Sequence, residues 1–126
     1  MKKKIKILII NDDYINNKLL IMLLERNYKN ILIIEAENGL EGLEKFKEEG
    51  DIDLILLNNL MPIMSGIEFL KIFRANENNK DMPIIFFSAS EYFIEEALGL
   101  GANIGMRKPI KENRMFSAID KLLFDK

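Results

Sequence analysis

Short hydrophobic segments alternate with longer amphipathic ones along the whole chain. Five of the short segments have the length of a strand, and most are nearly continuous runs of isoleucine, leucine and phenylalanine. They span residues 5–10, 31–35, 53–57, 83–88 and 103–107. Runs of this kind are typical of strands that are buried on both faces of a parallel sheet. The fifth segment is more polar than the others, so we expect it at an edge of the sheet.

Hydrophobic residues between the first three strands recur with the period of a helix. Their positions are Ile15, Leu19, Met22 and Leu23 in the first predicted helix, and Leu40, Leu43 and Phe46 in the second. Residues with this spacing lie on one face of a helix, so we expect each stripe to face the core. Asp13 is placed to cap the first helix, Asn38 marks the start of the second, and Gly50 marks its end.

Three further helices complete the pattern. The third is predicted over residues 65–75, and the fourth over residues 91–100, where Gly101 ends it. The buried positions expected in the third and the last helix are Ile67, Leu70 and one of Phe69 and Phe73, then Met115, Ile119 and Leu122. Five successive strand–helix units predict an α/β fold, a doubly wound five-stranded parallel sheet flanked by five helices.

Composition and charge narrow the possible chemistry. The chain has 126 residues, 20 acidic and 18 basic side chains, and neither histidine nor cysteine. This length predicts a single domain over residues 1–126. A net charge of −2 argues against a nucleic-acid binder. No segment has the ~20 apolar residues that cross a membrane, so a cytoplasmic protein is expected. Ser-His-Asp hydrolysis and thiolate zinc sites are excluded.

Polar residues follow the predicted strands at the points where the strands end. They are Asn11, Asp12 and Asp13 after the first strand, Asn58 and Asn59 after the third, Ser88 after the fourth, and Lys108 and Pro109 after the fifth. In doubly wound sheets, ligands bind beyond the carboxyl ends of the strands. We therefore expect acids, amides, a hydroxyl and an ammonium group to converge on one edge of the sheet.

Four segments together resemble the receiver domains of response regulators. The sequence ILIINDDYINN at residues 7–17 is similar to their acidic opening, and DLILLNNLMPIMSG at residues 53–66 to the segment around their phosphoacceptor. PIIFFSAS and GANIGMRKP resemble their fourth and fifth strands. The resemblance spans almost the whole chain. It implies a CheY-like, flavodoxin-like sheet with the strand order 2-1-3-4-5 and no output domain in this chain.

The resemblance also implies a chemistry for the strand ends. In the family, an aspartate at the end of strand 3 takes a phosphoryl group from a phosphohistidine. Mg²⁺, the strand-4 hydroxyl and the strand-5 lysine neutralise the phosphoryl oxygens. Here the matching positions are Asn58 for the acceptor, Ser88, Lys108, and the metal ligands Asn11, Asp12 and Asn58. Pro109 is expected to follow a cis peptide bond.

The resemblance further implies the kind of partner. A histidine kinase, a phosphotransfer protein or an effector protein would bind through the first helix, or through the last two helices and the fifth strand. Neither nucleic acid nor a membrane is expected as a partner, and a monomer or weak dimer is expected. The chain would act as an interaction module of two-component phosphorelay signalling and not as an enzyme.

The sequence departs from the family pattern at three positions. Asn58 replaces the acceptor aspartate, and a carboxamide is a poor nucleophile because its nitrogen lone pair is delocalised. Asn11 replaces a metal-binding acid, so Mg²⁺ should bind weakly or not at all. Gly105 stands at the switch position, where the family usually has an aromatic residue. With Asn11 and Asn58 neutral, Lys108 is expected to turn toward Asp12.

Several alternatives remain open at this point. Asp13 or Ser88 could accept the phosphoryl group instead, or Asn58 could be an engineered change in a normal receiver. Asp12 could serve only to cap the first helix. A flavodoxin-like or nucleotide-binding enzyme is disfavoured because the turn after the first strand has no glycine and carries two negative charges.

Overall fold

In the computed structural model, which describes residues 4–124, five parallel strands form one sheet in the order β2-β1-β3-β4-β5. The strands are β1 (Ile5–Ile10), β2 (Ile31–Ala36), β3 (Leu54–Asn58), β4 (Ile84–Ser88) and β5 (Ile104–Arg107). Each predicted strand is confirmed to within one residue at its ends, and the more polar β5 lies at an edge of the sheet as expected.

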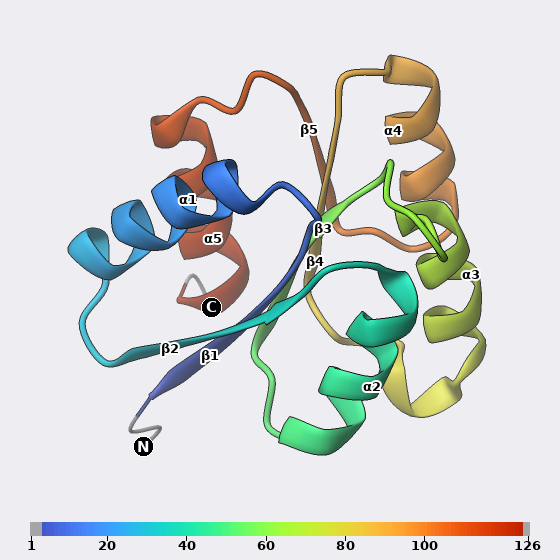
Figure 1. The fold of residues 1–126 in the computed structure, drawn as a ribbon, viewed down its shortest axis with the longest axis horizontal. Helices are drawn as coiled ribbons and strands as arrows, with labels where there is room; N and C mark the ends of the chain where they lie inside the picture. The colour runs from blue at the N-terminus through green and yellow to red at the C-terminus, as the bar shows by residue number, and fades with distance from the viewer. Residues whose placement is uncertain (1–3, 125–126) are drawn as a thin grey trace.

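Five α-helices of the described part of the chain cover the two faces of this sheet (Figure 1). They are α1 (Tyr14–Asn27), α2 (Gly39–Glu49), α3 (Gly66–Ala75), α4 (Glu91–Gly99) and α5 (Glu112–Leu123), and a 3-10 helix, η1 (Glu77–Asn79), follows α3. α1 and α5 lie on one face, and α2, α3 and α4 on the other (Figure 1). Within residues 4–124, no helix is long and hydrophobic enough to cross a membrane.

Each face of the sheet has its own hydrophobic core. Alternate residues of a strand point to opposite faces, so Leu8 and Ile10 contact the α2, α3 and α4 side while Ile7 and Ile9 contact the α1 and α5 side. β3 and β4 are buried along their whole length because they lie inside the sheet with helices on both faces. The carboxyl ends of these two strands are therefore held by packing on both sides.

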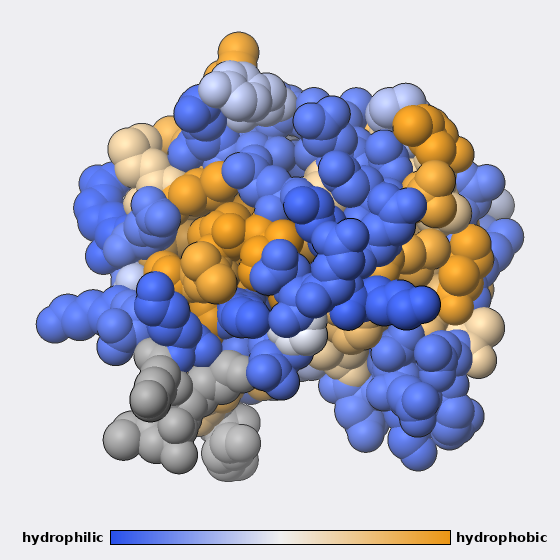
Figure 2. Space-filling model, turned by 60° about the horizontal axis from the view of Figure 1, so that its bottom comes forward, coloured by the Kyte–Doolittle hydropathy of each residue, from blue (hydrophilic) through white to orange (hydrophobic). Residues whose placement is uncertain are grey.

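The predicted core-facing stripe of α1 is wrong. Ile15 is 78% exposed, and Leu19 and Met22 are each 52% exposed, whereas Asn17 and Leu24 are buried. α1 is hydrophobic almost all round from residue 19 to residue 24, so the spacing alone does not determine which side packs against the sheet. The outward stripe leaves hydrophobic surface in solvent. Figure 2 shows hydrophobic surface on the left of the molecule, where α1 and α5 lie in Figure 1, and a second hydrophobic area on the right.

α3 buries more than was predicted. Both Phe69 and Phe73 are buried, and their rings stack with centroids 5.1 Å apart. The expectation that only one of them would be buried is wrong because α3 packs against α2 as well as the sheet. Phe73 meets Phe46 of α2 edge-on, with ring centroids 4.8 Å apart. A helix with two neighbours buries a wider arc than a helix that covers a sheet alone.

Arg74, at the end of α3, connects four segments at the amino edge of the sheet. Its guanidinium donates hydrogen bonds to the backbone oxygens of Gly101 and Met82, and Nη2 lies 3.2 Å from Oδ1 of Asn103. A further bond reaches the backbone oxygen of Asn79 in η1. The planar fork of arginine can satisfy several acceptors that diverge in this way. Arg74 thus holds the ends of α3 and α4 against the starts of β4 and β5.

Replacing Arg74 by lysine should destabilise the domain by about 1–2 kcal/mol, because one ammonium nitrogen cannot reach the same set of carbonyl oxygens. The free energy of unfolding is measured by urea denaturation. Arg114→Lys is the matched control, since Arg114 is exposed on α5 and should be nearly neutral. Equal stability of the two variants would mean that the hydrogen bonds of Arg74 contribute nothing.

Candidate functional site

The predicted site residues lie at the carboxyl edge of the sheet. Asn58 and Ser88 are the last residues of the neighbouring strands β3 and β4, and they are only 7% and 6% exposed. Asn11 follows β1 and Lys108 follows β5. Asn11, Asn58 and Lys108 line one small cavity of about 20 Å³. The structure therefore brings Asn11, Asn58 and Lys108 to one cavity, while Ser88 ends the neighbouring strand at the same edge of the sheet.

Lys108 turns toward Asn58 and not toward Asp12. Its ammonium donates a 2.6 Å hydrogen bond to Oδ1 of Asn58, and its backbone N–H donates to the backbone oxygen of Ser88 at 2.9 Å. The predicted pairing with Asp12 is wrong for a topological reason. Asp12 follows β1, which lies one strand farther from β5 than β3 does, and its side chain is exposed. The peptide bond between Lys108 and Pro109 is cis, as expected.

Both polar atoms of the Asn58 carboxamide form hydrogen bonds. Oδ1 accepts the bond from Lys108, and Nδ2 donates to the backbone oxygen of Leu60 at 3.3 Å. The amide nitrogen therefore points to the loop that follows β3. A neutral, nearly buried amide in this position supplies neither a nucleophilic oxygen nor a negative charge.

Asn11 is bonded to the start of α1. Its Nδ2 donates to Oδ1 of Asn17 at 3.0 Å, and its Oδ1 accepts from the backbone N–H of Asp13 at 3.3 Å. Asn17 returns a bond to the backbone oxygen of Asn11. Sequence reasoning missed Asn17, which is buried in α1. Asn17 stands between Asn16 and Lys18, so no sequence signal set it apart from its polar neighbours. Its two bonds with Asn11 hold that residue against the helix.

The two acids after β1 have different surroundings. Asp13 caps α1, because its carboxylate accepts from the backbone N–H of Asn16 at 3.1 Å and from the side chain of Asn16. The predicted cap is confirmed, and the alternative that Asp12 serves as the cap is wrong. Asp12 lies exposed at the rim of the site.

The side chains at this edge do not fit Mg²⁺. Mg²⁺ prefers octahedral sets of oxygen ligands that usually include carboxylates. In the part of the chain that the structure describes, no three acidic, histidine or cysteine side chains lie close enough together to hold a metal. Oδ1 of Asn58 already accepts a bond from a cation, and Oδ1 of Asn11 accepts from a backbone N–H. Of the three predicted ligands, Asp12 alone carries a negative charge.

The loop after β3 is fixed by a second buried amide. Asn59 accepts a hydrogen bond from the backbone N–H of Ile67 through its side chain and from that of Gly66 through its backbone oxygen. Ser65 and Glu68 form a capping box at the same helix start. The sequence placed Asn59 among the polar residues that follow the strands and gave it no separate role. Its two bonds instead hold the start of α3 directly against the end of β3.

Gly105 lies where α4 packs closely on β5. It pairs with Phe86 in the sheet, and a Cβ atom added to it would lie 2.5 Å from Cγ2 of the buried Ile94. Ile94 of α4 thus occupies the space next to Gly105.

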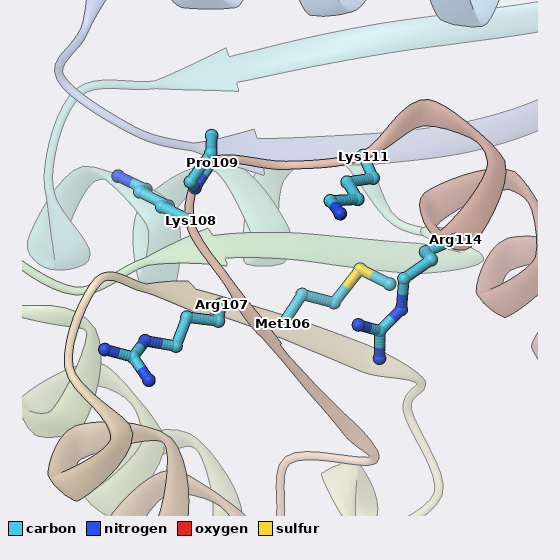
Figure 3. A pocket seen from close by; sticks show the side chains of 6 residues that line it. All are labelled: Met106, Arg107, Lys108, Pro109, Lys111 and Arg114. Atoms are coloured by element: carbon cyan, nitrogen blue, oxygen red, sulfur yellow. The ribbon is translucent and has the colours of Figure 1, made fainter.

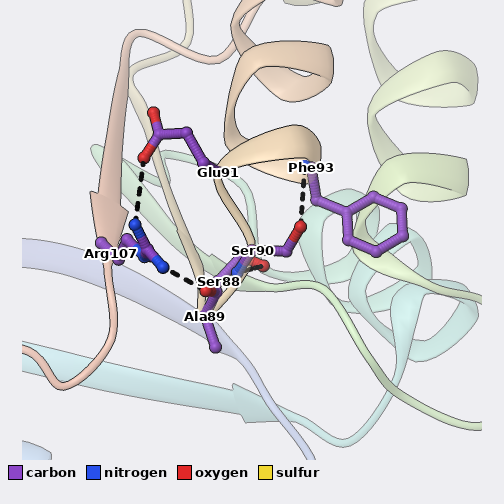
Figure 4. Close-up of polar contacts among 6 residues, drawn as sticks. All are labelled: Ser88, Ala89, Ser90, Glu91, Phe93 and Arg107. Carbon is purple, nitrogen blue, oxygen red and sulfur yellow. Dashed lines mark hydrogen bonds and ion pairs between the residues drawn. The ribbon is translucent and has the colours of Figure 1, made fainter.

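The loop between β4 and α4 is tied to β5. The hydroxyl of Ser88 accepts from the backbone N–H of Ser90 at 3.0 Å, and Ser90 caps α4 (Figure 4). Arg107 donates to the backbone oxygen of Ala89 and forms an ion pair with Glu91 at 3.8 Å (Figure 4). These contacts join the β4–α4 loop to β5, and the backbone N–H of Lys108 bonds to the backbone oxygen of Ser88.

Comparison with known proteins agrees with the fold. The chain is 33% identical over 125 residues to the chemotaxis protein CheY-3 of Vibrio cholerae. The alignment covers 97% of this chain and 94% of CheY-3. It is also 34% identical over 120 residues to a transcriptional regulatory protein of Haemophilus influenzae, a CpxR homolog. That alignment covers 94% of this chain but only half the length of the relative.

A solved structure gives the same result. CheY of Borrelia burgdorferi, in a complex with CheX, BeF₃ and Mg²⁺, superposes with a TM-score of 0.82 at 27% identity, over 93% of this chain and 87% of that one. The family of response regulator receiver domains matches residues 7–120. With its β2-β1-β3-β4-β5 sheet and its polar strand ends, the chain belongs to the response regulator receiver domain family.

Proposed function

We propose that this receiver domain works as a protein-interaction module of two-component signalling that is not phosphorylated at position 58 and is not an enzyme. The observation that carries the proposal is the contact between Lys108 and Asn58. A carboxamide there cannot form an acyl phosphate, and its oxygen is already paired with the lysine. Within two-component signalling, such a domain acts by binding a partner protein through its surface.

We propose that Mg²⁺ binds weakly or not at all at the strand ends. Two of the three predicted ligands are neutral amides whose oxygens accept bonds from Lys108 and from the backbone of Asp13. One exposed carboxylate, that of Asp12, supplies too little charge to strip water from Mg²⁺.

We propose that a histidine kinase, a phosphotransfer protein or an effector binds on the side of α1. The stripe of Ile15, Leu19 and Met22 is exposed there, and a cavity of about 290 Å³ lies between α1 and the segment that leads into α5. Leu19 and Ile110 line this cavity on opposite sides. Exposed hydrophobic side chains beside a cavity are typical of a protein-binding surface.

Phosphorylation at Asp13 or Ser88 is less well supported. The carboxylate of Asp13 is engaged in the cap of α1, and the hydroxyl of Ser88 is nearly buried and bonded to the backbone of Ser90.

The proposal is tested by measuring the intact mass after incubation with Mg²⁺ and a small phosphodonor. The unmodified chain should gain no phosphoryl group, whereas Asn58→Asp should gain one on a fraction of the molecules, because it restores the nucleophile. Asn11→Asp is the matched control: it adds the same charge at the neighbouring strand end and should remain unlabelled. Labelling of the unmodified chain would refute the proposal.

A further inference from the structure

We propose that two copies of this chain pair through α1, with the two helices antiparallel about a two-fold axis, in a weak and reversible dimer. This dimer covers the exposed hydrophobic stripe of Ile15, Leu19 and Met22. The inference goes beyond the proposed function, because it gives the α1 surface a second occupant, so that self-association and partner binding compete. It does not depend on the chemistry at position 58.

The first support is the spacing of the stripe. Ile15, Leu19 and Met22 are separated by four and then three residues, which are the steps between positions d, a and d of a heptad repeat. The f positions of the same heptads hold Asn17 and Leu24, which are the two buried residues of α1. Because position f lies opposite positions a and d, the stripe points directly away from the core. A second helix can therefore lie along the stripe while α1 stays packed on the sheet.

The second support is the charge beside the stripe. Lys18 and Glu25 occupy the g positions of α1, and both are exposed. In the described part of the chain, neither of them forms an ion pair. An antiparallel pair that stacks Leu19 of one copy on Met22 of the other brings the g positions together, so Lys18 of each copy faces Glu25 of the other. A parallel pair would instead place Lys18 opposite Leu23, in position e, and would form neither ion pair.

The size of the stripe sets the strength of the dimer. α1 has 14 residues and is therefore about 21 Å long, so an interface confined to it is small. Arg26 stands at the next a position and ends the stripe. Leu23 lines the cavity of about 290 Å³ beside α1, so some hydrophobic surface continues past the stripe. We expect a Kd on the order of 100 μM, which leaves the surface open to a partner at low concentration.

The surface between β5 and α5 is less suited to a second copy. Arg107, Lys111 and Arg114 line the cavity on that side (Figure 3). A two-fold axis through this cavity would bring the positive charges of the two copies together, and like charges repel. α1 instead offers a hydrophobic stripe with one base and one acid beside it, which is complementary to itself when the helices are antiparallel.

The test is sedimentation equilibrium at constant ionic strength, over concentrations from about 10 μM to about 1 mM. The unmodified chain should show a reversible monomer–dimer equilibrium. Lys18→Glu and Glu25→Lys each place like charges opposite one another twice, so each should raise the Kd about tenfold. The variant that carries both changes should regain the Kd of the unmodified chain. An equimolar mixture of the two single variants should form heterodimers, because every facing pair is then one glutamate and one lysine.

Lys111→Glu is the matched control, since it makes the same charge change on the β5–α5 surface and should leave the Kd unchanged. Four results would overturn the inference: a monomer at every concentration, a Kd that Lys18→Glu does not alter, no rescue in the double variant, or a tighter dimer in Lys111→Glu. A monomer would leave the stripe to a partner protein. Because these measurements use the chain alone, their failure would not affect the proposed function, which the intact mass tests separately.

Discussion

Replacing Gly66 by alanine is expected to lower the free energy of unfolding by at least about 3 kcal/mol. A Cβ at this position would lie 2.2 Å from the backbone oxygen of Asn58 and 3.0 Å from Cα of Asn59. Both are backbone atoms at the end of a buried strand, so neither can turn aside as a flexible side chain does. The methyl group would push α3 away from β3 and break the bond from the Gly66 N–H to the oxygen of Asn59.

Gly99→Ala is the matched control for this prediction. A Cβ on Gly99, in the last turn of α4, would meet nothing within 4 Å. This substitution should leave stability unchanged or raise it by up to about 1 kcal/mol, because alanine loses less conformational entropy in a helix than glycine. Urea denaturation of the two variants gives the comparison. Similar stabilities of Gly66→Ala and Gly99→Ala would contradict the close approach of α3 to Asn58.

Most of the fold could be predicted because its signals are local. The runs of isoleucine and leucine in β1 and β3 have the length and burial that a parallel sheet requires. Asp13 and Ser65 have the side chains that cap helices. That Asn58, Ser88 and Lys108 lie at one edge could also be predicted, because the carboxyl ends of parallel strands meet at the same edge of the sheet.

The features that could not be predicted depend on contacts between distant segments. Lys108 bonds to Asn58 and not to Asp12 because fewer strands separate β5 from β3 than from β1. Arg74 looks like an ordinary helix-end arginine until its acceptors in η1 and the turn after α4 are known. The sequence did not show which side of α1 faces solvent, because hydrophobic residues surround much of the helix.

The close packing of Gly105 against Ile94 restricts how the domain can respond to a charge at position 58. In the family pattern, an aromatic side chain at the position of Gly105 would have a rotamer to switch, whereas glycine has none. The structure adds that a Cβ at position 105 would lie 2.5 Å from Cγ2 of the buried Ile94, so a larger side chain could be placed there only if Ile94 moved. We therefore propose that a phosphoryl group on Asn58→Asp changes little beyond the site and the loop that holds Ser88.

Amide shift mapping of Asn58→Asp with and without phosphodonor tests this expectation. Shifts should be concentrated at residues 58–66, 88–90 and 108, with small changes across residues 91–120. The comparison variant carries Asn58→Asp together with Gly105→Tyr and Ile94→Ala, since a tyrosine at 105 needs the space that Ile94 occupies. That variant should spread its shifts over α4, β5 and α5. Equally large shifts over residues 91–120 in Asn58→Asp alone would show that the signal crosses the domain without an aromatic residue at position 105.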